Sequence, residues 1–158
     1  MSQFSHRLIF REKDVLLRDS NGRQIKTFQK SDFLTSGGRY RVTESLLEKP
    51  LGTLLIEINV PIEVELAVKG QINANVKGAT ANANFPGATA NSNEKGAIAN
   101  AKVSGATANS NEKGAIANAN DQWAIANANE PGAIAKANVD GAEAYAKVQG
   151  ASIGYEID

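Results

Sequence analysis

The sequence predicts an all-β protein: a nonapeptide-repeat β-solenoid with two nine-residue units per coil and an alanine core, preceded by an N-terminal β-rich cap. Three observations lead to this prediction. From Gly78 to the C-terminus the chain repeats every nine residues, Ala occupies alternate positions in most units, and turn-forming residues ending in Gly separate the units. An antiparallel β-meander of five-residue strands would also fit the pattern and is the alternative fold.

The chain divides into a basic, β-rich cap region (1–54), transition strands (55–78) and the Ala/Asn/Gly repeat (79–158). In the cap, Asn21-Gly22 lies between two β-prone segments and predicts a hairpin with a type I′ turn, in which both central residues have positive φ. Residues 31–34 could form a short helical turn, and 39–43 have the composition of a strand. The short segment 45–49 is ambiguous, and Pro50 ends it.

The transition strands carry the clearest alternation in the chain. From Ile56 to Val68 every second residue is a large apolar one, which is typical of a strand with one buried face. Pro61 lacks a backbone N–H, so we expect it at an edge or a bend. Further on, Ile72, Ala74 and Val76 bring smaller side chains to the same face. The region therefore predicts a passage from an ordinary apolar core to an alanine core.

The repeat units favour strands over helices. The units are GATANANFP, GATANSNEK, GAIANAKVS, GATANSNEK, GAIANANDQ, WAIANANEP, GAIAKANVD, GAEAYAKVQ and GASIGYEID. Alternate alanines would spiral around a helix, whereas on a strand they all point to one face. Because nine is odd, an unbroken strand would turn its alanines to the other face at every unit. Each unit must therefore contain a turn, which leaves a strand of about five residues.

The longest match between units predicts how the coils stack. Residues 87–101 and 105–119 have the same sequence, 18 residues apart. Parallel stacking at this spacing would place like side chains in ladders. Inward alanines would also let two sheets approach closer than the usual ~10 Å. The outward residues would form Thr/Ile and Asn columns, which are the candidate surface: Thr80, Asn82, Thr89, Asn91, Ile98, Asn100, Thr107, Asn109, Ile116, Asn118, Ile125 and Asn127.

Several irregular residues are predicted to sit at corners or ends. Trp123 replaces a unit's leading Gly, and Glu143, Tyr145, Ile153 and Tyr155 replace the usual residues of the last two units. Terminal repeats are normally atypical because they close the core. We therefore expect a corner or capping role for Trp123 and Tyr145 rather than ligand binding.

Charge is balanced over the whole chain but not along it. Seventeen basic residues balance seventeen acidic ones, yet residues 1–50 carry ten basic and six acidic groups. A solvated face is the ordinary reading of this excess, and a patch for nucleic acid or phosphate is the functional one. The candidate basic patch is Arg7, Arg11, Arg18, Arg23, Arg39 and Arg41.

The N-terminus and the hydropathy pattern bear on localisation. The N-terminus has no apolar core of a cleaved signal, so we expect a cytoplasmic chain or export by a route without one. No apolar run approaches the ~18 residues of a membrane helix, so membrane insertion is not expected.

Few residue types in this chain perform chemistry. It has no cysteine and one histidine, His6, and it lacks a phosphate-binding loop or dinucleotide fingerprint. A catalytic triad, a metal site and a cofactor are therefore not expected. The nine-residue period and leading Gly are similar to those of the calcium-binding β-rolls of secreted repeat toxins, whose unit is GGxGxDxUx. At the Asp position this chain has Ala or Ser (Ala83, Ser92, Ala101, Ser110, Ala119), so the calcium ligands are missing.

These observations predict a non-enzymatic structural protein that assembles with copies of itself, as a fibre, filament or spike-type component. The reason is that an open strand edge at a solenoid end pairs readily with another copy. The alternative is a surface-binding protein that uses its Thr/Asn columns to bind ice or a repetitive polymer. The third hypothesis is a basic cap that binds nucleic acid or phosphate.

Overall fold

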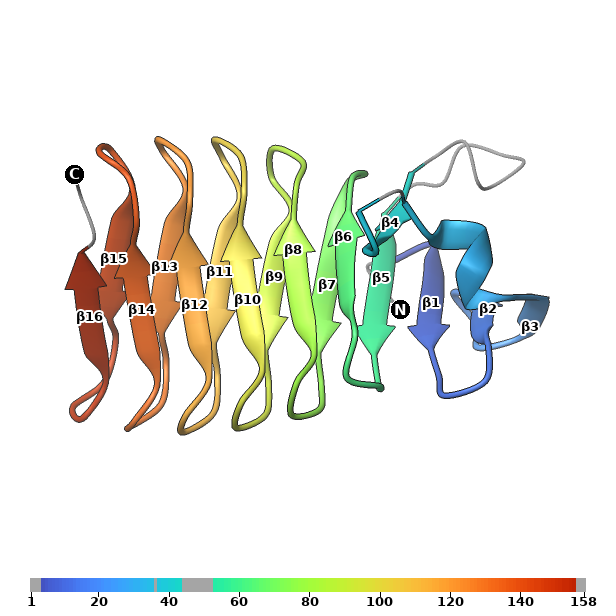
Figure 1. Cartoon of the computed structure of the whole chain (residues 1–158), viewed down its shortest axis with the longest axis horizontal. Coiled ribbons are helices and arrows are strands. Elements are labelled where there is room, and N and C mark those ends of the chain that lie inside the picture. Colours follow the sequence, from blue (N-terminus) through green and yellow to red (C-terminus); the bar gives the residue numbers. More distant parts are fainter. Residues whose placement is uncertain (1–3, 36, 44–52, 156–158) are drawn as a thin grey trace.

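The protein is a β-solenoid of about six turns, described by a computed structural model over residues 4–35, 37–43 and 53–155 (Figure 1). One layer contains β1 (His6–Phe10), β2 (Val15–Asp19), β3 (Gln24–Phe28), β5 (Leu54–Ile58), β7 (Gly70–Ala74), β9 (Thr89–Ser92), β11 (Thr107–Ser110), β13 (Ile125–Ala128) and β15 (Glu143–Ala146). The other contains β4 (Tyr40–Val42), β6 (Glu63–Leu66), β8 (Thr80–Ala83), β10 (Ile98–Ala101), β12 (Ile116–Ala119), β14 (Ile134–Ala137) and β16 (Ser152–Tyr155).

Consecutive strands of the solenoid alternate between two sheets. Sheet A has the order β15-β13-β11-β9-β7-β5-β1-β2-β3, and sheet B has the order β16-β14-β12-β10-β8-β6-β4. From β5 onward all neighbours are parallel, and in the repeat each residue lies beside the residue 18 positions away, as in Asn100↔Asn118. The solenoid prediction is confirmed. The meander alternative is wrong, because in the repeat consecutive strands do not pair with each other and neighbouring strands of each sheet are parallel. The repeat strands have four residues rather than five.

The hairpin predicted around Asn21-Gly22 is present, but its turn type differs. Strands β2 and β3 pair antiparallel with a bulge at Leu17/Arg18. Only Gly22 has a positive φ (82°), so the turn is not type I′. The Asp19 carboxylate accepts hydrogen bonds from the N–H groups of Asn21 and Arg23, both at 2.9 Å. An acidic residue before the turn thus favours a three-residue loop with Gly22 in the left-handed region.

An aromatic cluster fills the N-terminal end of the core. The 3₁₀ helix η1 (Lys30–Phe33) forms where the sequence predicts a helical turn and places Phe33 in the interior. The Phe33 ring contacts Phe10 and Phe28 edge-on, with centroid distances of 5.4 and 5.3 Å. Strand β4 confirms the strand predicted at 39–43. Residues 45–49 and Pro50 lie outside the described residues.

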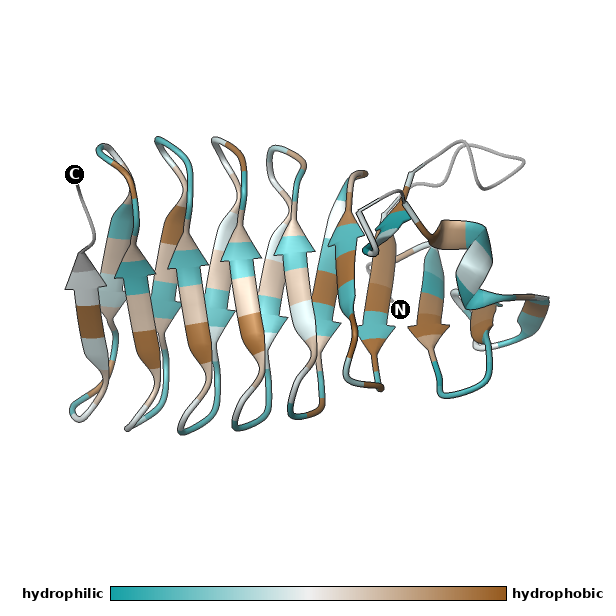
Figure 2. Ribbon diagram, viewed as in Figure 1, coloured by the Kyte–Doolittle hydropathy of each residue, from teal (hydrophilic) through white to brown (hydrophobic). Residues whose placement is uncertain are grey.

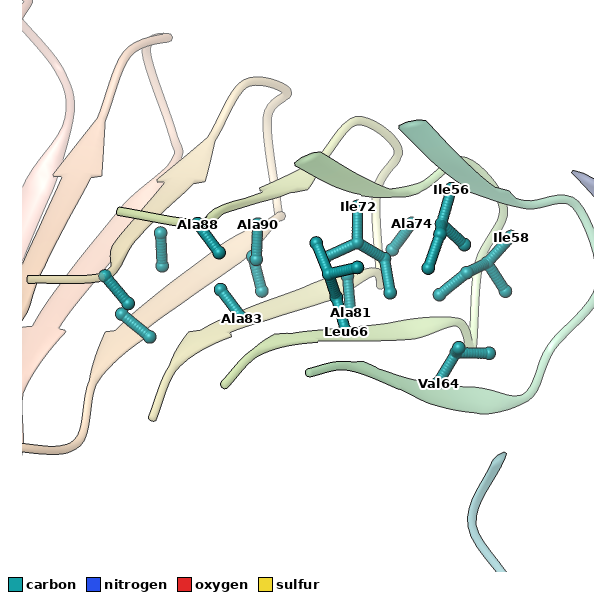
Figure 3. Close-up of a cluster of buried hydrophobic side chains, with 14 of the residues drawn as sticks. Ile56, Ile58, Val64, Leu66, Ile72, Ala74, Ala81, Ala83, Ala88 and Ala90 are labelled. Carbon is teal, nitrogen blue, oxygen red and sulfur yellow. The ribbon is translucent and has the colours of Figure 1, made fainter. Parts of the chain in front are cut away.

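The core tapers along the solenoid axis. Ile56, Ile58 and Leu66 are fully buried near the cap, whereas fully buried Ala81 and Ala90 take over at β8 and β9 (Figure 3). Figure 2 shows the same change as brown strands near the cap that give way to paler ones in the repeat. Pro61 lies in the bend between β5 and β6, as predicted.

The alanine core lets the two sheets approach closely. Strands β10 and β13 lie in opposite sheets and are not consecutive, yet they have Cα atoms within 8 Å of each other. The usual spacing of stacked sheets is ~10 Å. Two buried serines on the inner face also bond across this space: the Ser92 Oγ lies 3.1 Å from the Ile116 carbonyl oxygen, and the Ser110 Oγ lies 3.0 Å from that of Ile134. The short distance between the sheets therefore accommodates small side chains such as those of alanine and serine.

Candidate functional site

The asparagines of sheet A form a continuous ladder along the solenoid. The Nδ2 of Asn91 donates to the Oδ1 of Asn73 at 2.8 Å, Asn109 donates to Asn91 at 2.9 Å, and Asn127 donates to Asn109 at 2.9 Å. At the next position the residue is Tyr145, which pairs with Asn127 in the strand register. The ladder therefore ends one coil before the end of the sheet.

Sheet B carries a second ladder with the same polarity. Asn118 donates to Asn100 at 2.8 Å, and Asn100 donates to Asn82 at 2.7 Å. Asn82 in turn donates to the Glu63 carboxylate at 2.8 Å. In both ladders each amide donates toward the N-terminal end. At the N-terminal end of this ladder, the last amide donates to the Glu63 carboxylate. At its C-terminal end, Lys136 is the residue that follows Asn118 in the strand register.

Two further asparagine rows lie beside the turns and were not among the predicted site residues. One runs through Asn59, Asn75, Asn93, Asn111 and Asn129, with Nδ2–Oδ1 distances between 2.8 and 3.1 Å. In the other, Asn138 donates to Asn120 at 2.6 Å. The signal was present in the sequence, because Asn recurs at the seventh place of most units.

In these ladders, the amides that the sequence predicts as a binding surface are hydrogen-bonded to one another. Asn82 is fully buried, and Asn91, Asn100 and Asn127 have at most 9% of their surface exposed. A buried amide that already donates and accepts within a row has little capacity left for a ligand. Among the described residues, the Oδ1 atoms of Asn127 and Asn138 are the buried side-chain acceptors without a hydrogen-bond partner.

The predicted Thr/Ile columns are formed on two opposite faces. In sheet B, Thr80, Ile98 and Ile116 lie in register, and Ile134 follows them. In sheet A, Thr89, Thr107 and Ile125 also lie in register with one another. All these side chains are half-buried. The structure therefore brings the predicted surface residues together as two mixed, partly apolar columns rather than as one face.

The solenoid corners explain the repeated glycines, and Trp123 occupies one of the same positions. Gly87, Gly105, Trp123 and Gly141 form one corner column, and successive members are joined by backbone N–H···O hydrogen bonds of 3.0 to 3.4 Å. The glycines have φ near +85°, and Trp123 has φ of 69°. With 64% of its surface exposed, Trp123 occupies a corner, as predicted.

Four of the six arginines of the predicted basic patch are paired with carboxylates. Arg7 lies 2.6 Å from Glu57, Arg11 lies 2.7 Å from Asp14, Arg39 lies 3.5 Å from Glu63, and Arg41 lies 2.9 Å from Glu65. Of the other two, Arg18 donates to the Gly22 carbonyl and Arg23 follows the same turn. The pairing lowers the positive charge that this region presents to a polyanion.

The Arg11–Asp14 pair shifts the pKa of its acidic member. Arg11 donates two hydrogen bonds to the Asp14 carboxylate, at 2.7 and 2.8 Å. This bidentate contact lowers the pKa of Asp14 below its ordinary value. Both groups are exposed, so the pair organises the turn between β1 and β2 rather than a buried site.

The single histidine lies within β1, where its Nδ1 is 3.1 Å from the Ser5 hydroxyl. In the part of the chain that the structure describes, no three His, Asp or Glu residues are grouped as metal ligands would be. No helix there is long and apolar enough to cross a membrane.

The C-terminal end of the solenoid is the other candidate surface. Ala126 and Ala135 are fully buried inside it, but in the last coil Ile153, at the position beside Ala135, is 46% exposed. Tyr145 is also exposed, and its hydroxyl donates to Glu143.

The chain matches no protein-family model, and no curated protein or solved structure is significantly similar to it.

Proposed function

We propose that this chain is a non-enzymatic structural protein, a β-repeat rod that assembles with copies of itself as a fibre, filament or spike-type component. The internal hydrogen bonding of the repeat supports this proposal. Because the asparagines bond to one another from coil to coil, the polar groups of the repeat hold the rod together. A surface of this kind suits a scaffold better than a site that must exchange ligands.

The observation that carries the proposal is the difference between the two ends of the rod. At the N-terminal end the core is covered by the aromatic cluster and the β2–β3 hairpin. Within the described chain each sheet has an edge strand at both ends, β3 and β4 at the N-terminal end and β15 and β16 at the C-terminal end, but no described hairpin or aromatic cluster covers the last coil. An edge strand presents unpaired backbone N–H and C=O groups, which another chain can pair with.

Light scattering over a concentration series, with negative-stain microscopy of the same samples, tests this function. We expect the mass to rise above the 16.7 kDa of one chain as the concentration increases, with discrete oligomers or fibres in the images. A mass of one chain at every concentration would contradict the proposal.

The second candidate function is binding to ice or to a repetitive polymer. It is favoured by the register of the half-buried columns, in which Thr89 and Thr107 repeat once per coil. Thermal hysteresis of the wild type, abolished by Thr89→Lys with Thr107→Lys, would support it. The matched control is Glu94→Lys, a change of similar size at an exposed turn. An ordinary freezing curve for the wild type would exclude ice as the ligand.

A further inference from the structure

The last coil has the features of an interface rather than of a closed end. Within the described residues, β15 pairs only with β13, and β16 pairs only with β14. Natural edge strands are usually protected by proline, by inward-pointing charges or by bulges. Residues 143–155 contain no proline, and the inward positions hold Ala144, Ala146 and Ile153. Within the described residues, these edges therefore lack such protection.

The two edge strands are complementary in the sizes of their side chains. On β15 the outward residues Glu143 and Tyr145 are large, while the inward ones are alanines. On β16 the outward residues Ser152 and Gly154 are small, and the inward Ile153 is large. Placed side by side, β15 and β16 would match large with small on both faces of the sheet. Pairing either strand with a second copy of itself would match like sizes.

The direction of the strands allows this match twice in one symmetric contact. Strands of the two sheets run in opposite directions (Figure 1), and β16 lies half a coil beyond β15 because consecutive strands alternate between the sheets. A two-fold axis parallel to the strands exchanges the two sheets. It sets β15 of each copy antiparallel to β16 of the other, with equal spacing in both sheets. If β16 of one copy paired with β16 of the other, the two β15 strands would each lie half a coil further back. The distance between them would then exceed the pairing distance by a full coil.

From these three observations we propose that two copies of this chain join through their C-terminal ends, with β15 of each copy paired antiparallel to β16 of the other, in a closed dimer. The proposal rests on the proposed self-association and names its surface and symmetry. The contact buries Ile153 against the alanines of the second copy. An isologous contact of this type closes at two copies and does not propagate. At the opposite end of the described chain the edge strands are β3 and β4, which do not have this pattern of large and small residues.

A charged substitution in the last coil tests whether this coil is the dimer interface. Ile153→Lys places an inward charge on the free edge and should hold the protein at 16.7 kDa in sedimentation and light scattering, whereas the wild type reaches twice that mass. The matched control is Ile25→Lys: Ile25 is 50% exposed on β3, at the other end, and its substitution should leave the dimer intact. The circular dichroism spectra of both variants at 25 °C should resemble that of the wild type, which shows that both fold. The melting temperature of Ile153→Lys alone should fall, because association stabilises the folded chain.

Engineered cysteines test the symmetry, because the chain has none of its own. Tyr145 and Ser152 are outward residues close to the two ends of the segment 147–151 that joins β15 to β16, so the two-fold axis brings them close together on one face of the sheet. A mixture of Tyr145→Cys and Ser152→Cys chains should form disulfide-linked dimers under mild oxidation, and neither variant alone should do so. Linkage of Ser152→Cys alone would overturn the proposed pairing.

The outcomes separate this inference from the proposed function. Association that persists in Ile153→Lys, or that runs past two copies in the wild type, would overturn the closed dimer and leave self-assembly standing. A wild type that stays at the mass of one chain at every concentration would overturn both.

Discussion

The cap and the repeat are two solutions to the same problem of filling the space between β-strands. Near the cap, a few large side chains such as Phe10 and Ile56 remove much apolar surface from water. In the repeat, each inward alanine removes little, but the sheets come close together and the asparagine ladders add a hydrogen bond at every coil. The first region gains most of its stability from side-chain burial, and the second gains more of it from hydrogen bonds and close packing.

This comparison predicts that opposite changes of size damage the two regions. Phe10→Ala removes a buried ring that contacts Phe33 and should lower the free energy of unfolding by about 3–5 kcal/mol. In the repeat, Ala117→Leu adds volume where no space exists and should lower it by about 1–3 kcal/mol. The measurement is urea denaturation of each variant.

The neighbouring residue provides the control for the repeat. Ile116 lies on the same strand as Ala117 but is half-buried on the outer face. Ile116→Leu should therefore change stability by less than about 1.5 kcal/mol. If Ala117→Leu were as mild as Ile116→Leu, the alanine core would not be tightly packed.

The ladders can be tested by removing an interior rung and an end rung. Asn109→Ala breaks two amide hydrogen bonds, those with Asn91 and Asn127, whereas Asn127→Ala breaks only the bond to Asn109. Each buried amide group that loses its partner costs about 1–3 kcal/mol. Thermal unfolding should therefore show about twice the loss of free energy for Asn109→Ala. Equal losses would mean that the amide–amide hydrogen bonds do not determine the cost of removing a rung.

The repeat could be predicted from sequence because its constraints are local and recur. Alternation of Ala, a turn in each unit and identity at 18 residues together favour two sheets with parallel stacking over an antiparallel meander, and the structure has two parallel sheets. The type of the hairpin turn could not be predicted from Asn21-Gly22 alone, since the Asp19 carboxylate holds the backbone N–H groups of Asn21 and Arg23. Local rules fail where a side chain outside the motif decides the conformation.

The register of the outward asparagines could be predicted from the sequence, but the burial of their side chains could not. Alternation identifies Asn82 and Asn100 as outward residues, and their register is as expected. It does not reveal that neighbouring amides bury one another, because burial depends on the contacts of one coil with the next. In the same way, the sequence shows six arginines near the cap but not that Glu57 and Glu65 neutralise Arg7 and Arg41.

The corner column allows a smaller test within the repeat. The left-handed region costs a residue with a Cβ about 1–2 kcal/mol relative to Gly. Trp123→Gly should therefore stabilise the protein by about 1 kcal/mol, because the exposed indole contributes little packing. Gly105→Ala, at the equivalent place where a Cβ would find ordinary contacts only, should destabilise it by a similar amount. Melting temperatures that shift in opposite directions would support this; a loss of stability on Trp123→Gly would show that the indole packs on the corner.

The smallest expected effect lies in the cap, at the exposed Arg11–Asp14 pair. Because the pKa of Asp14 is lowered in the folded state, its ionised form favours folding above the unfolded pKa, and this contribution is lost as the pH falls through the folded value. NMR titration of the Asp14 carboxyl should give a midpoint below its ordinary value of about 3.9. In Arg11→Gln the midpoint should return toward that value, while the ladder from Asn73 to Asn127 in sheet A, which consists of amides alone, should be insensitive to pH between 3 and 7. A midpoint that does not move in Arg11→Gln would mean that the turn, rather than the guanidinium, holds Asp14 ionised.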